Sequence, residues 1–318
     1  MASLAQSIID TAHNMAAKPR KTQARYTETY FNSTAKFFNN AARAAHMAEL
    51  STEFYKDIPA IAPLVKKAMR FSIDQNVADA IVKIAKTPDE TLLQALPYAR
   101  PPHNPAWIEF CLPEGDLKVG WLVESKGNDL HMHYVFSTSK MNHFPTYMPE
   151  TGSYGIVSPD GYRAGLNNRT TASYNQDMAK ERHQHIRRTC HDALSILLLL
   201  NSRSKILTVE EPSDNLTKLN KARLKNGKEE IMPMNKVVFD IARVIRKTGK
   251  SDVDAMREMA AALVRGHFKV RQTGVFFWSP HVRNARDEDD KKEIYTREIA
   301  SERRDVVCTG PTMLPQPL

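Results

Sequence analysis

The spacing of apolar positions changes along the chain. Before residue 97 apolar side chains recur at helical intervals, as they do from Ile58 to Met69, and no run alternates with the period of two that marks a strand. From residue 107 to about residue 157, three β-favouring runs, WIEFCL, LKVGWLVES and LHMHYVFSTS, are separated by turn-forming residues. These patterns predict helices first and an antiparallel sheet after them.

The proline-rich segment YARPPHNP, residues 98–105, lies between these two parts, and proline cannot continue a helix. We therefore predict a helical region over 1–97, an α+β domain over 98–284 and a charged, mobile tail over 285–318. The predicted fold class is α+β: a helical N-terminal region followed by a mixed domain with a mostly antiparallel sheet and a basic β-hairpin.

Four further elements are expected in the second half of the chain. Residues 176–200 predict a long helix whose apolar end, ALSILLLL, is buried. KILTVEEP and MNKVVFDIARVI predict strands, and LTKLNKARLKN between them predicts a basic helix that ends at Gly227. Residues 248–262 predict an exposed helical insert capped by Ser251.

Residues 263–283, LVRGHFKVRQTGVFFWSPHVR, predict the basic hairpin. Two β-favouring runs flank QTG, so Gly274 is expected to supply a positive φ at the turn. Alternation places Phe268 on one face of the first strand. The opposite face is expected to carry the residues spaced by two, which are Arg265, His267, Lys269 and Arg271. Pro280 ends the pairing and turns His281 and Arg283 outward.

The charge of the chain indicates the kind of partner that it could bind. The net charge is +9, and residues 200–283 alone hold 17 Lys and Arg against 9 Asp and Glu, a balance that favours polyanions. Cations beside Trp and Phe offer phosphate donors next to stacking surfaces, as single-stranded nucleic acid requires. The predicted nucleic-acid-binding residues are Arg265, Lys269, Arg271, Trp278 and Arg283 near the hairpin, and Lys221, Arg223 and Lys225 on the basic helix. The two clusters could form one groove. Alternatively, each is an ordinary solvated face.

Two other functions stay open at this stage. A metal-independent ribonuclease needs an acid, a base and a cation for the phosphate, and His267 and His281 are the catalytic candidates. An interaction protein could instead block a host defence or transcription component through its helical N-terminus. The chain carries no Walker A loop, Rossmann fingerprint, GxSxG, HExxH or kinase motif, and we expect no cofactor.

We assign no metal site. His131 and His133 share one strand face, where they form either a metal-binding pair or a solvent-facing pair. His183 and His185 point about 200° apart on the long helix, and His191 is two turns from His183. They are therefore interpreted as surface histidines.

The expected location is the cytoplasm. Cys111, Cys190 and Cys308 lie far apart, which fits a reducing compartment. The first residues lack the uninterrupted apolar stretch of a signal peptide. The longest apolar run, Ile196 to Leu200, is far shorter than the roughly 20 residues that cross a bilayer.

One resemblance adds to this interpretation. The succession of LLLLNSR, LTKLNKARLKNGK and VRGHFKVRQTGVFFWSPHVRN over about residues 194–284 resembles uncharacterised proteins of bacteriophages and related mobile elements. The resemblance implies a phage-type origin and action in the host cytoplasm, and it implies no particular reaction. Relative to that group, residues 246–262 look like an insert. We therefore expect a phage-type nucleic-acid-binding protein, with either RNA or DNA as the ligand.

Overall fold

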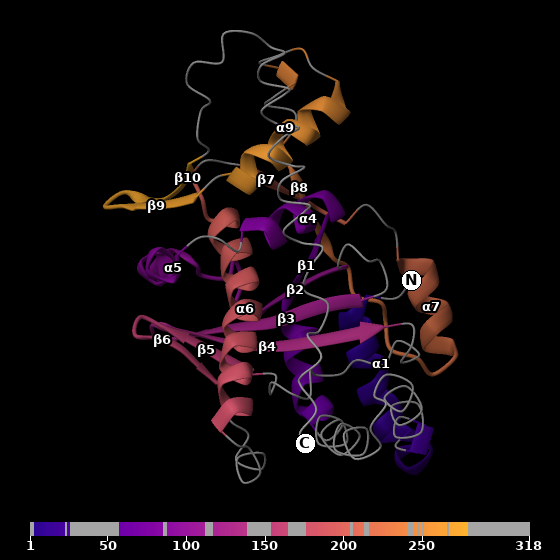
Figure 1. Cartoon of the computed structure of the whole chain (residues 1–318). Coiled ribbons are helices and arrows are strands. Elements are labelled where there is room, and N and C mark those ends of the chain that lie inside the picture. The colour runs from indigo at the N-terminus through magenta and orange to yellow at the C-terminus, as the bar shows by residue number, and fades with distance from the viewer. Residues whose placement is uncertain are drawn as a thin grey trace, which may run out of the picture. The chain divides into compact units, whose positions relative to one another are not determined.

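The computed structural model divides the chain into two units, Met1–Ser279 and Pro280–Leu318 (Figure 1). The described residues all belong to the first unit. They are residues 3–22, 24–25, 57–84, 88–111, 117–138, 154–164, 176–203, 206–212, 216–240, 245–246, 249, 251–265 and 267–278. The tail predicted over 285–318 lies outside them.

An eight-stranded sheet organises this unit. The strands are β1 (Met69–Ile73), β2 (Ala106–Cys111), β3 (Leu117–Lys126), β4 (Asp129–Thr138), β5 (Tyr154–Ser158), β6 (Gly161–Ala164), β7 (Leu207–Glu210) and β8 (Asn235–Phe239). Their spatial order is β6-β5-β4-β3-β2-β1-β8-β7, and among these described strands only β1 pairs in parallel, with β2 and with β8. The predicted α+β class, with helices followed by a mostly antiparallel sheet, is confirmed.

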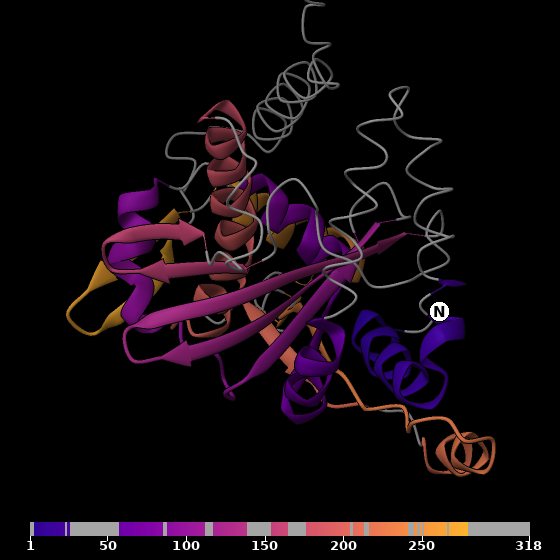
Figure 2. The ribbon, with the colours of Figure 1, turned by 90° about the horizontal axis from the view of Figure 1, so that it is seen from below.

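Helices cover both faces of the sheet (Figure 2). The described helices are α1 (Leu4–Ala17), a helix at residues 57–67, α4 (Gln75–Ile84), α5 (Asp89–Ala95), the 3-10 turn η1 (Leu96–Tyr98), α6 (Gln176–Leu200), α7 (Thr217–Lys225) and α9 (Asp252–Arg265), and short helical stretches are described at residues 19–22, 24–25 and 245–246. The helix ends predicted at Gly227 (φ 62°) and Ser251 are confirmed, and Ser251 Oγ accepts a hydrogen bond from the Asp254 N–H. The helix predicted as an exposed insert instead packs on α4 and buries Ala255.

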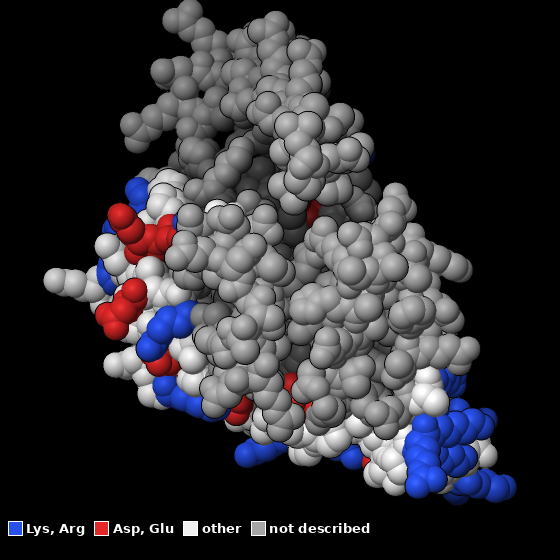
Figure 3. All heavy atoms as spheres, turned by 60° about the horizontal axis from the view of Figure 1, so that its bottom comes forward, with Lys and Arg blue, Asp and Glu red and all other residues white. Residues whose placement is uncertain are grey.

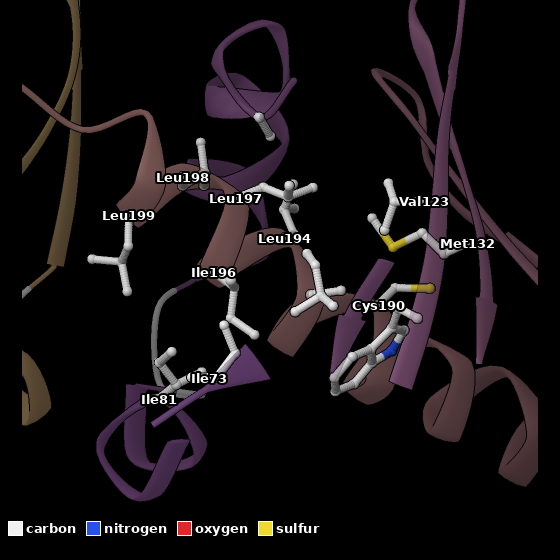
Figure 4. Close-up of a cluster of buried hydrophobic side chains, with 14 of the residues drawn as sticks. Ile73, Ile81, Val123, Met132, Cys190, Leu194, Ile196, Leu197, Leu198 and Leu199 are labelled. Carbon is white, nitrogen blue, oxygen red and sulfur yellow. The ribbon is translucent and has the colours of Figure 1, made fainter. Parts of the chain in front are cut away.

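The larger core lies on the face covered by α4, α5 and α6. Residues 193–199, at the apolar end of α6, are all buried, and Figure 4 shows the labelled side chains of this end pointing to several sides of the helix. Leu194 and Leu197 lie on the side toward Val123 and Met132, while Ile196 lies beside Ile73 and Ile81. The predicted burial of this half of the helix is confirmed.

Strand β1 was not expected from the sequence, in which the helical spacing of apolar residues continues as far as Met69. Arg70 explains the difference, because its guanidinium donates to the carbonyl oxygens of Val65 and Lys66 and thereby closes the last turn of the helix at residues 57–67. Its Nε donates to the Pro233 carbonyl oxygen. A buried arginine in a five-residue strand breaks the apolar alternation by which strands are recognised.

The second, smaller core lies on the opposite face, beneath α1. Glu109 of β2 is buried there, and its carboxylate accepts hydrogen bonds from the N–H groups of Leu4 (3.2 Å) and Ala5 (3.0 Å). The Gln6 N–H donates to Ser3 Oγ, and the Ser7 N–H donates to the Ser3 carbonyl oxygen. The first four N–H groups of α1 are therefore satisfied, and Glu109 joins the helix start to the sheet.

Trp107 and Gly120 complete this contact. Trp107 is buried and its Nε1–H donates to Glu109 Oε2 at 2.8 Å. A Cβ on Gly120 would lie 2.9 Å from Cη2 of Trp107 and closer still to Cζ2, so this position of β3 has no room for a side chain. The missing side chain leaves room for the indole ring of Trp107 and for Leu4 of α1 against the strand.

Replacing Glu109 with Gln is expected to destabilise the fold by about 1–3 kcal/mol, measured by denaturant unfolding. Three donors converge on the two carboxylate oxygens, whereas an amide has only one oxygen. At least one N–H group must then face the amide nitrogen. Glu210→Gln on the exposed edge strand β7 is the matched control, and an equal loss from both variants would contradict this role for Glu109.

Candidate nucleic-acid interface

The predicted hairpin is present. Strands β9 (His267–Arg271) and β10 (Gly274–Trp278) pair antiparallel about Gln272 and Thr273, and Gly274 has a φ of 137°. His267 pairs with Trp278, Lys269 with Phe276 and Arg271 with Gly274. Because directly paired residues project from the same face, His267, Lys269, Arg271 and Phe276 share one face of the hairpin.

Arg265 does not belong to this row. It is the last residue of α9, so the strand begins only at His267. The stretch DVDAMREMAAALVR consists mostly of good helix formers and starts behind a capping serine, and α9 packs on α4. Helix propensity, the serine cap and packing on α4 together outweigh the β preference of residues 263–265. The side chain of Trp278 and the residues His281 and Arg283 lie outside the described part of the structure.

The inner face of the hairpin fixes it to the body of the protein. Phe268 and Phe277 are 1% and 6% exposed, and their rings meet edge to face with centroids 5.2 Å apart. The Phe277 N–H donates to Ser202 Oγ, and the Arg203 N–H donates to the Val275 carbonyl oxygen. Since Ser202 and Arg203 directly follow α6, the hairpin is anchored to the end of that helix.

The outer face is basic and carries one aromatic ring. His267 and Arg271 are exposed, and Lys269 and Phe276 are half-buried. The Arg271 guanidinium carbon lies 5.8 Å from the centroid of the Phe276 ring. Arg203 is also exposed, and its Nε would lie 3.2 Å from a Cβ built on Gly274. We call Arg203, His267, Lys269, Arg271 and Phe276 the hairpin surface.

Arg203 was missed by the sequence analysis. It lies more than sixty residues before the hairpin, and only the packing of the α6 end against β10 brings it to the turn. Arg203 is the last residue of the segment LLLLNSR, and no local sequence pattern connects it with Gly274.

Helix α7 divides the predicted basic residues into two roles. Arg223 is used within the protein: its Nη2 lies 2.8 and 2.9 Å from the two carboxylate oxygens of Asp10, and its Nε donates to the Glu229 carbonyl oxygen. Lys221 and Lys225 are exposed, as is Lys218. Figure 3 shows Lys and Arg side chains gathered over the corner of the molecule where α7 lies.

The single groove considered in the sequence analysis is not formed by the described residues. Figures 1 and 2 both place α7 and the hairpin at opposite ends of the described unit, with the sheet between them. The hairpin contacts α5 and the end of α6, whereas α7 is bonded to α1 and to residues 229–231. Within the described part of the chain, the hairpin surface and the basic helix α7 are therefore separate from each other.

The histidines of β4 are less exposed than expected. His131 and His133 are both half-buried, and burial lowers the pKa of His133 to about 4. The interpretation as a solvent-facing pair is wrong for His133, because the sheet is covered on this face too, whereas His131 keeps part of its contact with solvent. Of the helix histidines, His191 is buried rather than on the surface, and the side chains of His183 and His185 lie outside the described ones. Among the described residues no group of three or more His, Cys, Asp or Glu could hold a metal ion.

A cluster formed by Cys190 and Asp192 of α6 and Tyr134 of β4 was also not foreseen. Burial raises the pKa of Asp192 to about 7 and that of the Cys190 thiol to about 12. Burial, together with the charge of the Asp192 carboxyl, raises the pKa of Tyr134, and the centroid of the Tyr134 ring is 5.5 Å from that of Trp121. Cys190 is buried and Asp192 and Tyr134 are half-buried, so the cluster influences stability more directly than binding.

Comparison of the chain with protein-family models, with curated proteins and with solved structures found no match. The resemblance over residues 194–284 stays a prediction. None of the described helices is long and apolar enough to cross a membrane.

Replacing Asp192 with Asn is expected to flatten the pH dependence of the free energy of unfolding. The folded-state pKa of about 7 lies above the ordinary value of 3.8, so the folded chain keeps a proton that the unfolded chain releases. Stability of the parent protein should therefore fall as pH rises from about 4 to 7. Relative to the parent protein, the variant should gain more free energy of unfolding at pH 8 than at pH 5, measured by urea unfolding.

Asp129→Asn, at a surface carboxylate 3.4 Å from Arg163, provides the control for this measurement. Equal pH profiles for Asp192→Asn and the parent protein would contradict the raised pKa.

Proposed function

We propose that this protein binds single-stranded nucleic acid through the hairpin surface. The observation that carries the proposal is the hairpin register, which puts His267, Lys269 and Arg271 on one outer face together with Phe276. The buried phenylalanines on the inner face support it, because they hold these side chains on an anchored platform.

The chemistry of this face suits a single strand. Arg203 and Arg271 form no ion pair with a described carboxylate, so their guanidinium groups are available to phosphate oxygens. Phe276 offers part of a ring on which an unpaired base can stack, and the guanidinium above it extends that stacking surface. A duplex would present only its backbone to such a ring.

The other two hypotheses have less support. A ribonuclease needs a second acid–base group beside His267, and its candidate, His281, lies outside the described residues. Docking of a host protein on the helical N-terminus would involve residues 26–56, which lie outside the described residues, and within α1 the apolar side chains Leu4, Ile8 and Ile9 already pack against the sheet. A phage-type origin and action in the host cytoplasm belong to the proposal through the resemblance over 194–284.

Changing Arg203, Lys269 and Arg271 together to Gln should reduce the slope of log K against log salt by about 2 for a single strand, at about 0.7 per lost phosphate contact. Fluorescence anisotropy of a labelled strand over a salt series measures this slope. The control variant changes Lys67, Lys126 and Lys236 to Gln, which removes the same charge elsewhere. If both variants give the same slope, the hairpin surface is not the binding site.

Phe276→Leu should weaken binding without changing the salt slope. Leu keeps most of the apolar volume and removes the π-face, and base–aromatic stacking contributes about 1–3 kcal/mol, or roughly 5- to 150-fold in affinity. The same anisotropy titrations measure both quantities. Unchanged affinity would show that no base stacks on this ring.

A further inference from the structure

We propose that three lysines of α7, Lys218, Lys221 and Lys225, form a second phosphate-binding surface that a long nucleic-acid strand occupies at the same time as the hairpin surface. We call these residues the α7 lysine face. The inference rests on the proposed function, and it adds the class of ligand: a strand long enough to reach both ends of the protein.

The geometry of α7 separates its anchors from its lysines. At about 100° per residue, Lys218, Lys221 and Lys225 fall within roughly 60° of one another around the helix axis. Asn220 and Arg223 lie on the opposite side. They hold the helix, Asn220 through two hydrogen bonds with the backbone of Ile231 and Arg223 through Asp10. The lysine face therefore points away from the body of the protein.

No ion pair within the described part of the chain neutralises the charge of this face. All three lysines are exposed, and among the described residues none of them forms an ion pair. Thr217 to Lys225 contains no acidic residue. By contrast, the neighbouring Lys66 lies 2.9 Å from Glu229. Three adjacent uncompensated charges on an anchored helix suit the regularly spaced phosphates of a polyanion.

A membrane surface fits this helix less well. Membrane-surface helices need one continuous apolar face opposite their cations. The exposed leucines Leu219 and Leu224 lie on separate flanks of α7, about 140° apart around the axis. The position opposite the lysines is already occupied by the contacts to Asp10 and Ile231.

Two surfaces at opposite ends make strand length decisive (Figures 1 and 2). A short strand can occupy only one surface at a time. A long strand that is bound at the hairpin surface raises the effective concentration of phosphate at α7. The second contact then strengthens the overall binding although neither surface binds more tightly by itself.

The test compares strands of about 10 and about 60 nucleotides, the shorter within the span of one binding surface. The α7 variant changes Lys218, Lys221 and Lys225 to Gln, which preserves helix propensity. With the long strand, the slope of log K against log salt should fall by about 2, and by about 4 when this variant is combined with the hairpin triple variant. With the short strand, the number bound per chain at saturation should fall from two to one. The Lys67, Lys126 and Lys236 variant is the charge-matched control.

The outcomes separate the two proposals. A parent protein that binds neither strand overturns both of them. If the hairpin variant flattens the slope while the α7 variant behaves as the control does, the second surface is refuted and the proposed function stands. A slope loss of equal size with both strand lengths, without a change in the number bound, would also refute a separate second surface. Unchanged thermal unfolding of the α7 variant confirms that any loss of binding is not a loss of fold.

Discussion

The buried carboxylate of Glu109 is the contact on which one side of this structure depends. It accepts hydrogen bonds from the first two N–H groups of α1 and from the Trp107 indole, and so fixes the start of the helix over the sheet. From there α1 supplies Asp10, the partner of Arg223, and Gln6, which accepts from the Met232 N–H. The position of α7 therefore follows from a carboxylate in the middle of the sheet. Its burial is costly in isolation, and three converging donors offset much of that cost.

The other side of the structure depends on α6. Its apolar end is enclosed by the sheet, α4 and α5. The residues that follow it are hydrogen-bonded to strand β10 of the hairpin: Ser202 Oγ accepts from the Phe277 N–H, and the Arg203 N–H donates to the Val275 carbonyl oxygen. The inner phenylalanines extend the same core. A basic face is thus carried on a rigid support, which reduces the conformational entropy lost when a ligand orders its side chains. The two basic surfaces have different supports, so each can be altered without displacing the other.

The sequence predicted most elements because their signals are local. The alternation in β2, β3 and β4, the apolar end of α6, the Gly227 stop and the turn at Gly274 each depend on residues within a few positions. The failures have long-range causes. β1 contains Arg70, whose partners include a carbonyl at Pro233, and residues 263–265 join α9 because that helix packs on α4. Arg223 looked like its neighbouring lysines, and only contact with Asp10, 213 positions away, distinguishes it.

The sequence by itself determined the α+β class, the hairpin and its alternation, and the excess of positive charge after residue 200, since periodicity and composition are properties of short stretches of chain. Tertiary structure alone decided which cations face solvent, that Arg203 lies at the hairpin turn, and that the two basic clusters lie at opposite ends of the described unit. The physical reason is that a charged side chain has no intrinsic preference between a phosphate in solution and a carboxylate within the fold. The choice is made by whichever partner the packed chain brings within hydrogen-bonding distance, and for Arg223 that partner is Asp10.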